Sequence, residues 1–249
     1  MRIITLPDIN GFTPDWVVPK NIKCFTTYRY REKKNGTRLS FNFSKKENDE
    51  LASNLRLIQE SFSLIDSFYQ INQIHSNEII NISSDGVNAE KDADGIISYS
   101  PKLVCSVLTA DCIPVLCCSK KGDMVASLHC GWKGLASGII ERFIRDIAMD
   151  AKDITFWLGP SICNACYEVK DDFITLLEHK NIDIHSFVKN KDGKIYMDLK
   201  QLCIEQIMSY GALDVATSNL CTFCNNDKFF SHRKEKTAER FISMIWIDS

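Results

Sequence analysis

The sequence contains no long apolar segment and almost no net charge, and each absence excludes a class of protein. No apolar run approaches the ~20 residues that a membrane-spanning helix needs. The 30 basic and 32 acidic residues leave a net charge of −2, which gives no electrostatic footprint for nucleic acid or an anionic membrane. Internal repeats and low-complexity tracts are also missing. We therefore expect a soluble globular protein, with no nucleic acid and no membrane as partner.

The N-terminal segment also lacks the basic region and long apolar stretch of a secretory signal peptide. Without that signal, the eleven cysteines are not expected to form a disulfide framework. Cys105, Cys117 and Cys118 lie in apolar runs, where cysteine behaves as a small hydrophobic residue. These features predict a cytoplasmic protein with reduced thiols.

Strand-like and helix-like segments alternate irregularly along the chain. Apolar spacing predicts two long helices, over 47–68 and from Gly134 to about Ala148, whereas residues 1–24 show little periodicity. Turn signals of hairpin length join several of the strands. The expected strands include residues 22–30, 39–44, 155–158 and 241–247. The pattern predicts one α+β domain over residues 1–249 and argues against a doubly wound parallel sheet.

The stretch 103–140 contains three strand-like segments, and two of them end in reactive residues. Cys112 follows the first segment, and His129 ends the third. Because a turn at 120–123 folds the third segment back on the second, the two side chains are expected to meet. They are then either buried structural residues, a thiol nucleophile with its base, or two ligands of one metal. His75, at a polar break between strand-like segments, favours the metal, since a Cys/His/His set suits zinc and leaves one coordination position open.

Other polar residues offer an anion site and a second metal site. Lys133 lies in a Gly-bearing turn that precedes a helix, where backbone amides predict a phosphate site. Arg233, near the C-terminus, can bind a phosphate or carboxylate bidentately. Two CxxC pairs offer four thiols, but they lie further apart than the ~15–20 residues of familiar zinc motifs, so a structural zinc site is the weaker interpretation. The pairs are Cys163–Cys166 and Cys221–Cys224.

Six motifs between about Phe25 and Ile247 together resemble the YfiH family, whose members are also described as laccase-domain or multicopper polyphenol oxidase-like proteins and as purine nucleoside phosphorylases. The motifs are TADCIPVL, HCGWKGL, QIHSNEI, LGPSICNACYEV, CTF and FFSHR. The resemblance implies a mixed β-sandwich flanked by helices, related to the catalytic domain of a cysteine-hydrolase-like, deamidating bacterial toxin. It also implies that His75, Cys112 and His129 are metal ligands.

The expected function is that of a zinc-dependent purine nucleoside enzyme, with copper as a possible occupant of the same site. The resemblance implies phosphorolysis of adenosine, inosine and methylthioadenosine, and deamination of adenosine, by a monomer or small homo-oligomer. Purine nucleoside and phosphate are the expected partners. The three ligands and Asp111 are the expected catalytic residues, Asp111 or Asp94 handling ribose or a proton. The expected substrate-binding residues are Asn42, Asp94, Lys133 and Arg233.

One alternative is a non-enzymatic structural metal domain, in which the site only braces the fold. Two enzymatic alternatives also remain. One is a metal-independent cysteine hydrolase or amidase that edits peptidoglycan, with Cys112 as nucleophile and His129 as base. The other is a copper-dependent polyphenol oxidase, although one Cys/His/His set does not supply the several ligand sets of a multicopper cluster. Four family motifs at the expected substrate rim are altered here. The altered segments are Tyr28–Arg31, Asn54–Leu55, Ser231–Arg233 and Ala238–Arg240.

Overall fold

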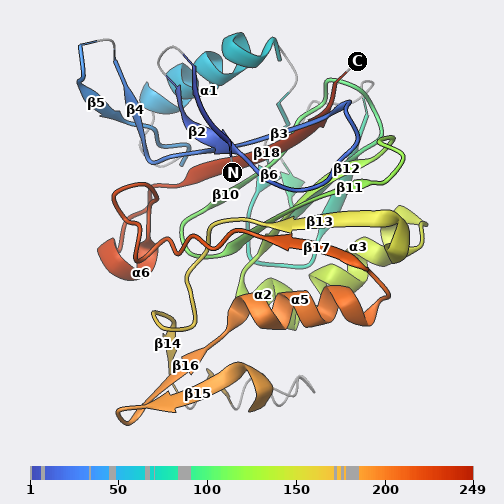
Figure 1. Cartoon of the computed structure of the whole chain (residues 1–249), viewed down its shortest axis with the longest axis vertical. Helices are drawn as coiled ribbons and strands as arrows, with labels where there is room; N and C mark the ends of the chain where they lie inside the picture. Colours follow the sequence, from blue (N-terminus) through green and yellow to red (C-terminus); the bar gives the residue numbers. More distant parts are fainter. Residues whose placement is uncertain are drawn as a thin grey trace.

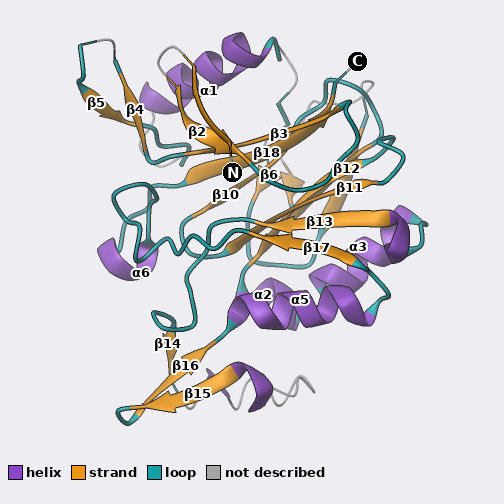
Figure 2. Cartoon of the chain, in the orientation of Figure 1, coloured by secondary structure: helices purple, strands orange, loops and turns teal. Residues whose placement is uncertain are grey.

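Two stacked β-sheets form the middle of the molecule, and helices cover both outer faces (Figures 1 and 2). The computed structural model describes residues 2–6, 9–33, 35–44, 49–64, 68–69, 71–83, 91–170, 173–174, 177 and 185–248. Helix α1 (Asp49–Phe62) lies on one side of the sheets. Helices α2 (Trp132–Ala136), α3 (Ile139–Ile147) and α5 (Leu199–Ser209) lie on the other. The fold is a mixed α/β sandwich, as the sequence predicts; the relation to a toxin domain stays a prediction.

The first sheet has five strands, and every neighbouring pair is antiparallel. Its order is β1-β2-β3-β18-β10. The strand bounds are β1 Arg2–Leu6, β2 Ile9–Thr13, β3 Ile22–Thr27, β10 Cys105–Thr109 and β18 Phe241–Ile247. The last strand of the chain therefore pairs with both an early and a middle strand, which brings the segment before β18 next to the loop after β10.

The second sheet has six strands in the order β17-β13-β11-β12-β9-β7. The outer pairs β13–β17 and β7–β9 are parallel, and the three inner pairs are antiparallel. The strand bounds are β7 Ile79–Ile82, β9 Gly95–Ser98, β11 Ile113–Ser119, β12 Val125–Cys130, β13 Ile154–Leu158 and β17 Asp214–Thr217. The expected fold-back of β12 on β11 is confirmed.

Smaller sheets complete the described part of the chain. The three-stranded one projects from the end opposite α1 (Figure 1). These elements are β4 (Tyr30–Glu32), β5 (Arg38–Ser40), β6 (Ile71–Asn72), β8 (Lys91–Asp92), β14 (Glu168–Val169), β15 (Val188–Lys191), β16 (Lys194–Met197), α6 (His232–Glu235) and the 3₁₀ turns Ala151–Asp153 and His185–Phe187. No helix among the described residues is long and apolar enough to cross a membrane.

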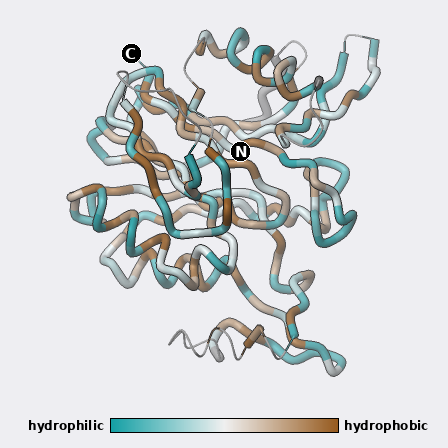
Figure 3. Tube along the Cα trace, turned by 180° about the vertical axis from the view of Figure 1, so that it is seen from behind, coloured by the Kyte–Doolittle hydropathy of each residue, from teal (hydrophilic) through white to brown (hydrophobic). Residues whose placement is uncertain are grey.

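Strand β11 shows why an unbroken apolar run forms a strand here rather than a helix. Its residues are all buried, because one face packs against the helices and the other against the first sheet. Val115 and Cys117 belong to the core under α3 and α5, whereas Leu116 and Cys118 belong to the core between the sheets. Period-two alternation between two cores produces continuous hydrophobicity. Seen from behind, brown apolar segments run through the strands and teal polar residues gather at turns (Figure 3).

The structure differs from four sequence expectations about local structure. Residues 1–24 contain the β1–β2 hairpin. The sequence does not predict it, because these short strands have few alternating apolar positions. The helix expected from Gly134 to Ala148 is two helices, because Gly138 adopts a left-handed conformation with φ of 81°. The strand expected over 39–44 is limited to Arg38–Ser40. Helix α1 ends at Phe62, earlier than expected, and residues 47–48 and 65–67 of that prediction lie outside the described residues.

Candidate active site and metal cluster

Three strand connections bring Cys112, His129 and His75 together. Cys112 immediately precedes β11, and the pairing of β11 with β12 sets Pro114 opposite His129. His75 lies in the loop between β6 and β7, and β7 reaches β12 through β9. The candidate ligand atoms of the three side chains lie within 4.8 Å of one another. The structure thus forms the Cys/His/His cluster that the sequence predicts; its role in binding metal stays a prediction.

The cluster depends on close packing and on unusual backbone conformations. The two imidazole ring centroids are 4.7 Å apart, and Cys112 Sγ lies 4.0 Å from His75 Nε2. A Cβ atom on Gly131 would come within 2.9 Å of Cys112 Sγ, so only glycine fits there. His75 and Asp111 have φ values of 61° and 100°, in a region that non-glycine residues avoid. Such strain concentrates at functional sites, where the surrounding structure holds it.

Asp94 supports the cluster from behind. Its carboxylate is fully buried and accepts a hydrogen bond from His129 Nδ1 at 2.8 Å. It also accepts from the backbone N–H of His75 at 3.0 Å and from the N–H and hydroxyl of Ser76 at 2.6 and 2.8 Å. Because the carboxylate accepts from Nδ1, the Nε2 lone pair of His129 is free for a metal or a proton. Asp94 thus orients one imidazole and fixes the turn that carries the other.

Cys112 and His129 perturb each other's titration. Burial favours the neutral thiol, but the imidazoles of His129 and His75 outweigh it and lower the pKa of Cys112 to about 6. Burial also favours neutral imidazole, but the Cys112 thiolate and the Asp94 carboxylate raise the pKa of His129 to about 9. A thiolate beside a correctly oriented imidazole is competent both to ligate zinc and to act as a nucleophile.

A cavity of about 500 Å³ opens above the cluster. Apolar and aromatic side chains, including Leu108, Trp132 and Tyr167, form part of its lining. Lys133, Arg233 and Arg240 place three cationic groups on its walls. The Cys/His/His cluster below, aromatic faces on one side and cations around it are features of a site for a ligand with a flat ring and an anionic group.

The expected substrate-binding residues are divided between the cavity and the scaffold. Lys133 and Arg233 line the cavity, although helix α2 after Gly131 has only five residues. Asn42 and Asp94 are buried and outside the described lining. The side chain of Asn42 accepts hydrogen bonds from the backbone N–H groups of Ser44 and Arg240, both at 2.9 Å. The structure places Asn42 and Asp94 behind the wall, where they hold cavity residues in position.

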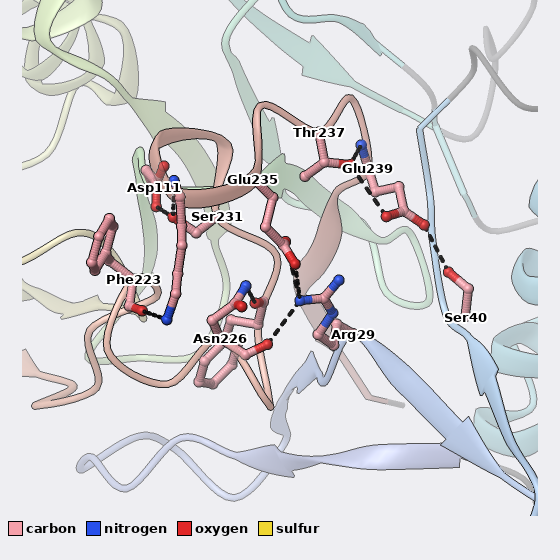
Figure 4. A network of polar contacts seen from close by, with 11 residues as sticks. Arg29, Ser40, Asp111, Phe223, Asn226, Ser231, Glu235, Thr237 and Glu239 are labelled. Atoms are coloured by element: carbon pink, nitrogen blue, oxygen red, sulfur yellow. Dashed lines mark hydrogen bonds and ion pairs between the residues drawn. The ribbon is translucent and has the colours of Figure 1, made fainter.

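Asp111 lines the cavity but directs its carboxylate into a network that fixes the chain before β18 (Figure 4). It accepts hydrogen bonds from Thr222 Oγ1 at 2.6 Å, Ser231 Oγ at 2.7 Å and the backbone N–H of Arg233 at 2.6 Å. Arg29, in one of the altered family segments, donates to Glu235 at 2.9 Å in the same network. These contacts set the position of the Arg233 backbone.

Several cavity residues escape sequence reasoning. Gln73 exchanges two hydrogen bonds with the backbone of Leu108, at 2.8 and 2.9 Å, and thereby docks the loop that carries His75 onto β10. Trp132, the first residue of α2, and Tyr167, in the loop before β14, both line the cavity, and burial raises the pKa of the Tyr167 hydroxyl. No spacing rule in the sequence links these residues. They come together only because the two sheets pack against each other.

The fold and the cluster define a small α/β sandwich protein with a Cys/His/His cluster beside a cavity. Residues 23–248 match the sequence model of a family described as multi-copper polyphenol oxidoreductase laccase. The chain therefore belongs to this family, which its relatives identify as the YfiH family.

Relatives with established names cover most of the chain. A Haemophilus influenzae protein named purine nucleoside phosphorylase is 32% identical over 247 residues, which cover 96% of this chain and 100% of that protein. An Escherichia coli protein named purine nucleoside phosphorylase YfiH is 33% identical over 181 residues, which cover 71% of this chain and 72% of that protein. A Neisseria meningitidis crystal structure has a TM-score of 0.87 at 29% identity, covering 96% of this chain and 99% of that chain.

Proposed function

We propose that this chain is a metal-dependent purine nucleoside phosphorylase that cleaves adenosine, inosine or methylthioadenosine with phosphate. The observation that carries the proposal is the Cys/His/His cluster at the base of a cavity of about 500 Å³ with three cationic side chains on its walls. The names of the Haemophilus influenzae and Escherichia coli relatives support the same activity.

The three side chains fit a zinc ion by their donor chemistry. One thiolate and two imidazoles are nitrogen and sulfur donors that zinc prefers, and three protein ligands leave one position open. Asp94 bonded to His129 is the carboxylate partner that metal-bound histidines usually have, and Gly131 leaves room beside Cys112. When bound, zinc supplies Lewis-acid polarisation of the nucleoside or of a water molecule. Copper suits the same donors.

The cavity walls account for the two substrates. Lys133, Arg233 and Arg240 are placed to bind phosphate, since guanidinium groups match phosphate oxygens bidentately. Trp132 and Tyr167 offer aromatic faces against which a purine can stack. In the reaction, a phosphate oxygen bonds to C1′ of the ribose as the bond from C1′ to the purine nitrogen breaks, and the departing base takes up a proton. Holding phosphate and C1′ in contact is the main contribution of these residues.

The test is product analysis with purified protein. Inosine is incubated with and without phosphate, and hypoxanthine, ribose 1-phosphate and free ribose are quantified. The proposal expects hypoxanthine and ribose 1-phosphate in equal amounts, and no cleavage without phosphate. Free ribose in place of ribose 1-phosphate would make the enzyme a hydrolase and contradict the proposal. Adenosine supplied without phosphate tests the accompanying deamination, in which water replaces the exocyclic amino group and inosine accumulates.

A second candidate function has its own structural support. Cys112, His129 and Asp94 are arranged as thiol, imidazole and carboxylate, the order of a cysteine-hydrolase triad. This arrangement supports a metal-independent amidase, including one that edits peptidoglycan. His75 discriminates between the phosphorylase and the amidase. Its imidazole lies 4.0 Å from the Cys112 thiol, and a thiol–imidazole–carboxylate triad does not require a second imidazole. Amidase activity of the His75→Ala variant that persists in the presence of a metal chelator would favour the amidase.

A further inference from the structure

The two CxxC pairs, Cys163–Cys166 and Cys221–Cys224, meet at one place in the fold. We call these residues the four-cysteine cluster. Their four Sγ atoms lie within 4.8 Å of one another, and the Cys166 and Cys224 sulfurs are 3.4 Å apart. Four thiolates around zinc, each about 2.3 Å from the ion, are separated from one another by about 3.8 Å. The cluster therefore has the dimensions of a tetrathiolate metal site.

Backbone hydrogen bonds bring the two pairs into register. Ser161 and Cys221 form an isolated parallel bridge, in which the N–H of Ser161 donates to Leu220 O at 3.3 Å and the N–H of Thr222 donates to Ser161 O at 3.2 Å. The N–H of Cys163 donates to Cys221 Sγ at 3.3 Å. An N–H aimed at a sulfur is the interaction that stabilises a thiolate ligand. This hydrogen bond to a sulfur joins two loops whose cysteines are 58 residues apart in the sequence.

Each pair is also folded into a tight turn that directs its two thiols to the same side. The N–H of Cys166 donates to Cys163 O at 3.0 Å, and the N–H of Asn225 donates to Cys221 O at 2.8 Å. The Asn225 side chain donates to the same Cys221 oxygen at 2.9 Å. Closed CxxC turns facing each other are the usual construction of a structural zinc site.

The environment of the cluster differs from that of the structural cysteines. Cys117 and Cys203 are fully buried in the core beneath the helices. Cys163 and Cys166 are only half-buried and Cys224 is exposed, and none of the four belongs to the apolar clusters of the described residues. Cys221 is buried, but it also lies outside these apolar clusters, so apolar packing does not account for the meeting of the four thiols.

We propose that the four-cysteine cluster binds one zinc ion as a structural site, separate from the site of His75, Cys112 and His129. Four thiolate ligands fill the tetrahedron and leave no open position, so this ion does not meet substrate. It joins the loop that carries Ile162 and Tyr167 to the loop that carries Thr222 and leads to Arg233. Both loops contribute to the cavity wall, so the ion holds that wall together.

The test counts metal in the full-length protein by mass spectrometry of the element after purification in a reducing buffer with zinc. The wild type should hold two zinc ions per chain. Cys112→Ser should hold one, the double variant Cys166→Ser/Cys224→Ser should hold one, and the combined triple variant none. The metal count makes no reference to turnover, so its result is independent of whether the chain is a phosphorylase.

Cobalt substitution identifies which site each variant retains. Tetrahedral cobalt with four thiolates absorbs visible light strongly and shows intense sulfur-to-metal charge transfer. The intense four-thiolate component of this spectrum should persist in Cys112→Ser, which loses only the weaker single-thiolate contribution of the Cys/His/His site. The same component should disappear in Cys166→Ser/Cys224→Ser. Because Cys112→Ser leaves the cluster intact, this comparison decides the matter even if the double variant fails to fold.

Two results would overturn the proposal. One is a wild type and a Cys166→Ser/Cys224→Ser variant with equal zinc content. The other is a Cys112→Ser protein that is free of metal and contains a Cys166–Cys224 disulfide, detected by a mass two hydrogens lower that reverts on reduction.

Discussion

The two cysteine-containing clusters are built from similar ligands and differ in nearly everything else. His75, Cys112 and His129 lie at strand ends, over a buried carboxylate that orients one imidazole, and they face a cavity. The four-cysteine cluster lies on loops, closes on itself, and is held by backbone bonds. In the two proposed metal sites, the number of ligands and the rigidity of their support distinguish a catalytic from a structural role. Three ligands on a rigid frame leave one coordination position open for reaction, and four ligands on loops leave none.

The largest effect is expected from Cys112→Ala. Losing one of three ligands removes the metal, and several kcal/mol of Lewis-acid stabilisation correspond to roughly a thousand-fold in rate. We expect inosine turnover with phosphate to fall by about that factor and the protein to lose one metal equivalent. Cys118→Ala, which alters a thiol in the core between the sheets, is the control and should keep its metal. A Cys112→Ala protein that keeps its metal but loses activity would instead support Cys112 as a catalytic nucleophile.

Asp94→Asn should come next. An amide at this position keeps the shape of the side chain but loses the charge that faces His129. Partners of metal-bound histidines typically contribute about 10–100-fold in metal affinity or activity, and we expect a loss in that range. The measurement is zinc affinity by competition with a chromogenic chelator. Addition of excess zinc should restore most of the turnover, since all three ligands remain; lack of rescue would mean that the carboxylate acts directly in the reaction.

A substitution in the cavity wall should change substrate affinity and leave metal binding unchanged. Lys133→Ala removes one of the three cationic side chains, and a lost charge-assisted hydrogen bond of about 1.5 kcal/mol corresponds to about ten-fold. We expect KM for phosphate to rise by about that factor, with KM for inosine and the metal content unchanged. Lys121→Ala, an exposed lysine in the turn between β11 and β12, is the matched control. An increase in KM for inosine with KM for phosphate unchanged would place Lys133 on the nucleoside instead.

The smallest effect on catalysis is expected from Cys166→Ser/Cys224→Ser. If this cluster is structural, kcat should stay within about two- to three-fold of wild type, because the reacting groups are untouched. A structural ligand worth about 2–3 kcal/mol corresponds to roughly 5–10 °C in Tm for a chain of this size. Calorimetry should show that decrease with zinc present. A variant with unchanged Tm and strongly reduced kcat would reverse the assignment of roles.

The meeting of three reactive side chains could be predicted from residue types at strand ends. His75, Cys112 and His129 are polar residues that interrupt apolar runs, and the fold of β11 on β12 was readable from the turn between them. The same reasoning places Asp94 and Asn42 at the substrate. The structure puts both behind the wall, because the burial of a polar side chain depends on what the second layer of the sandwich covers.

The remaining features depend on contacts between distant segments. The CxxC pairs look too far apart for one zinc site, and the Ser161–Cys221 bridge, which no local pattern encodes, brings them together. Arg240 reaches the cavity because β18 pairs with β10. The break between α2 and α3 is more local: Gly138 was visible in the sequence, but its left-handed conformation was not.

The central claim is that metal at the Cys/His/His cluster is required for phosphorolysis. The most direct measurement is a zinc titration of chelator-stripped wild-type protein, with metal content and inosine phosphorolysis followed on the same samples. We predict negligible turnover in the stripped protein, and turnover that rises with zinc and saturates when the cluster is filled. The same titration of Cys112→Ala should restore nothing. Full turnover of the stripped protein in the presence of chelator would contradict the account.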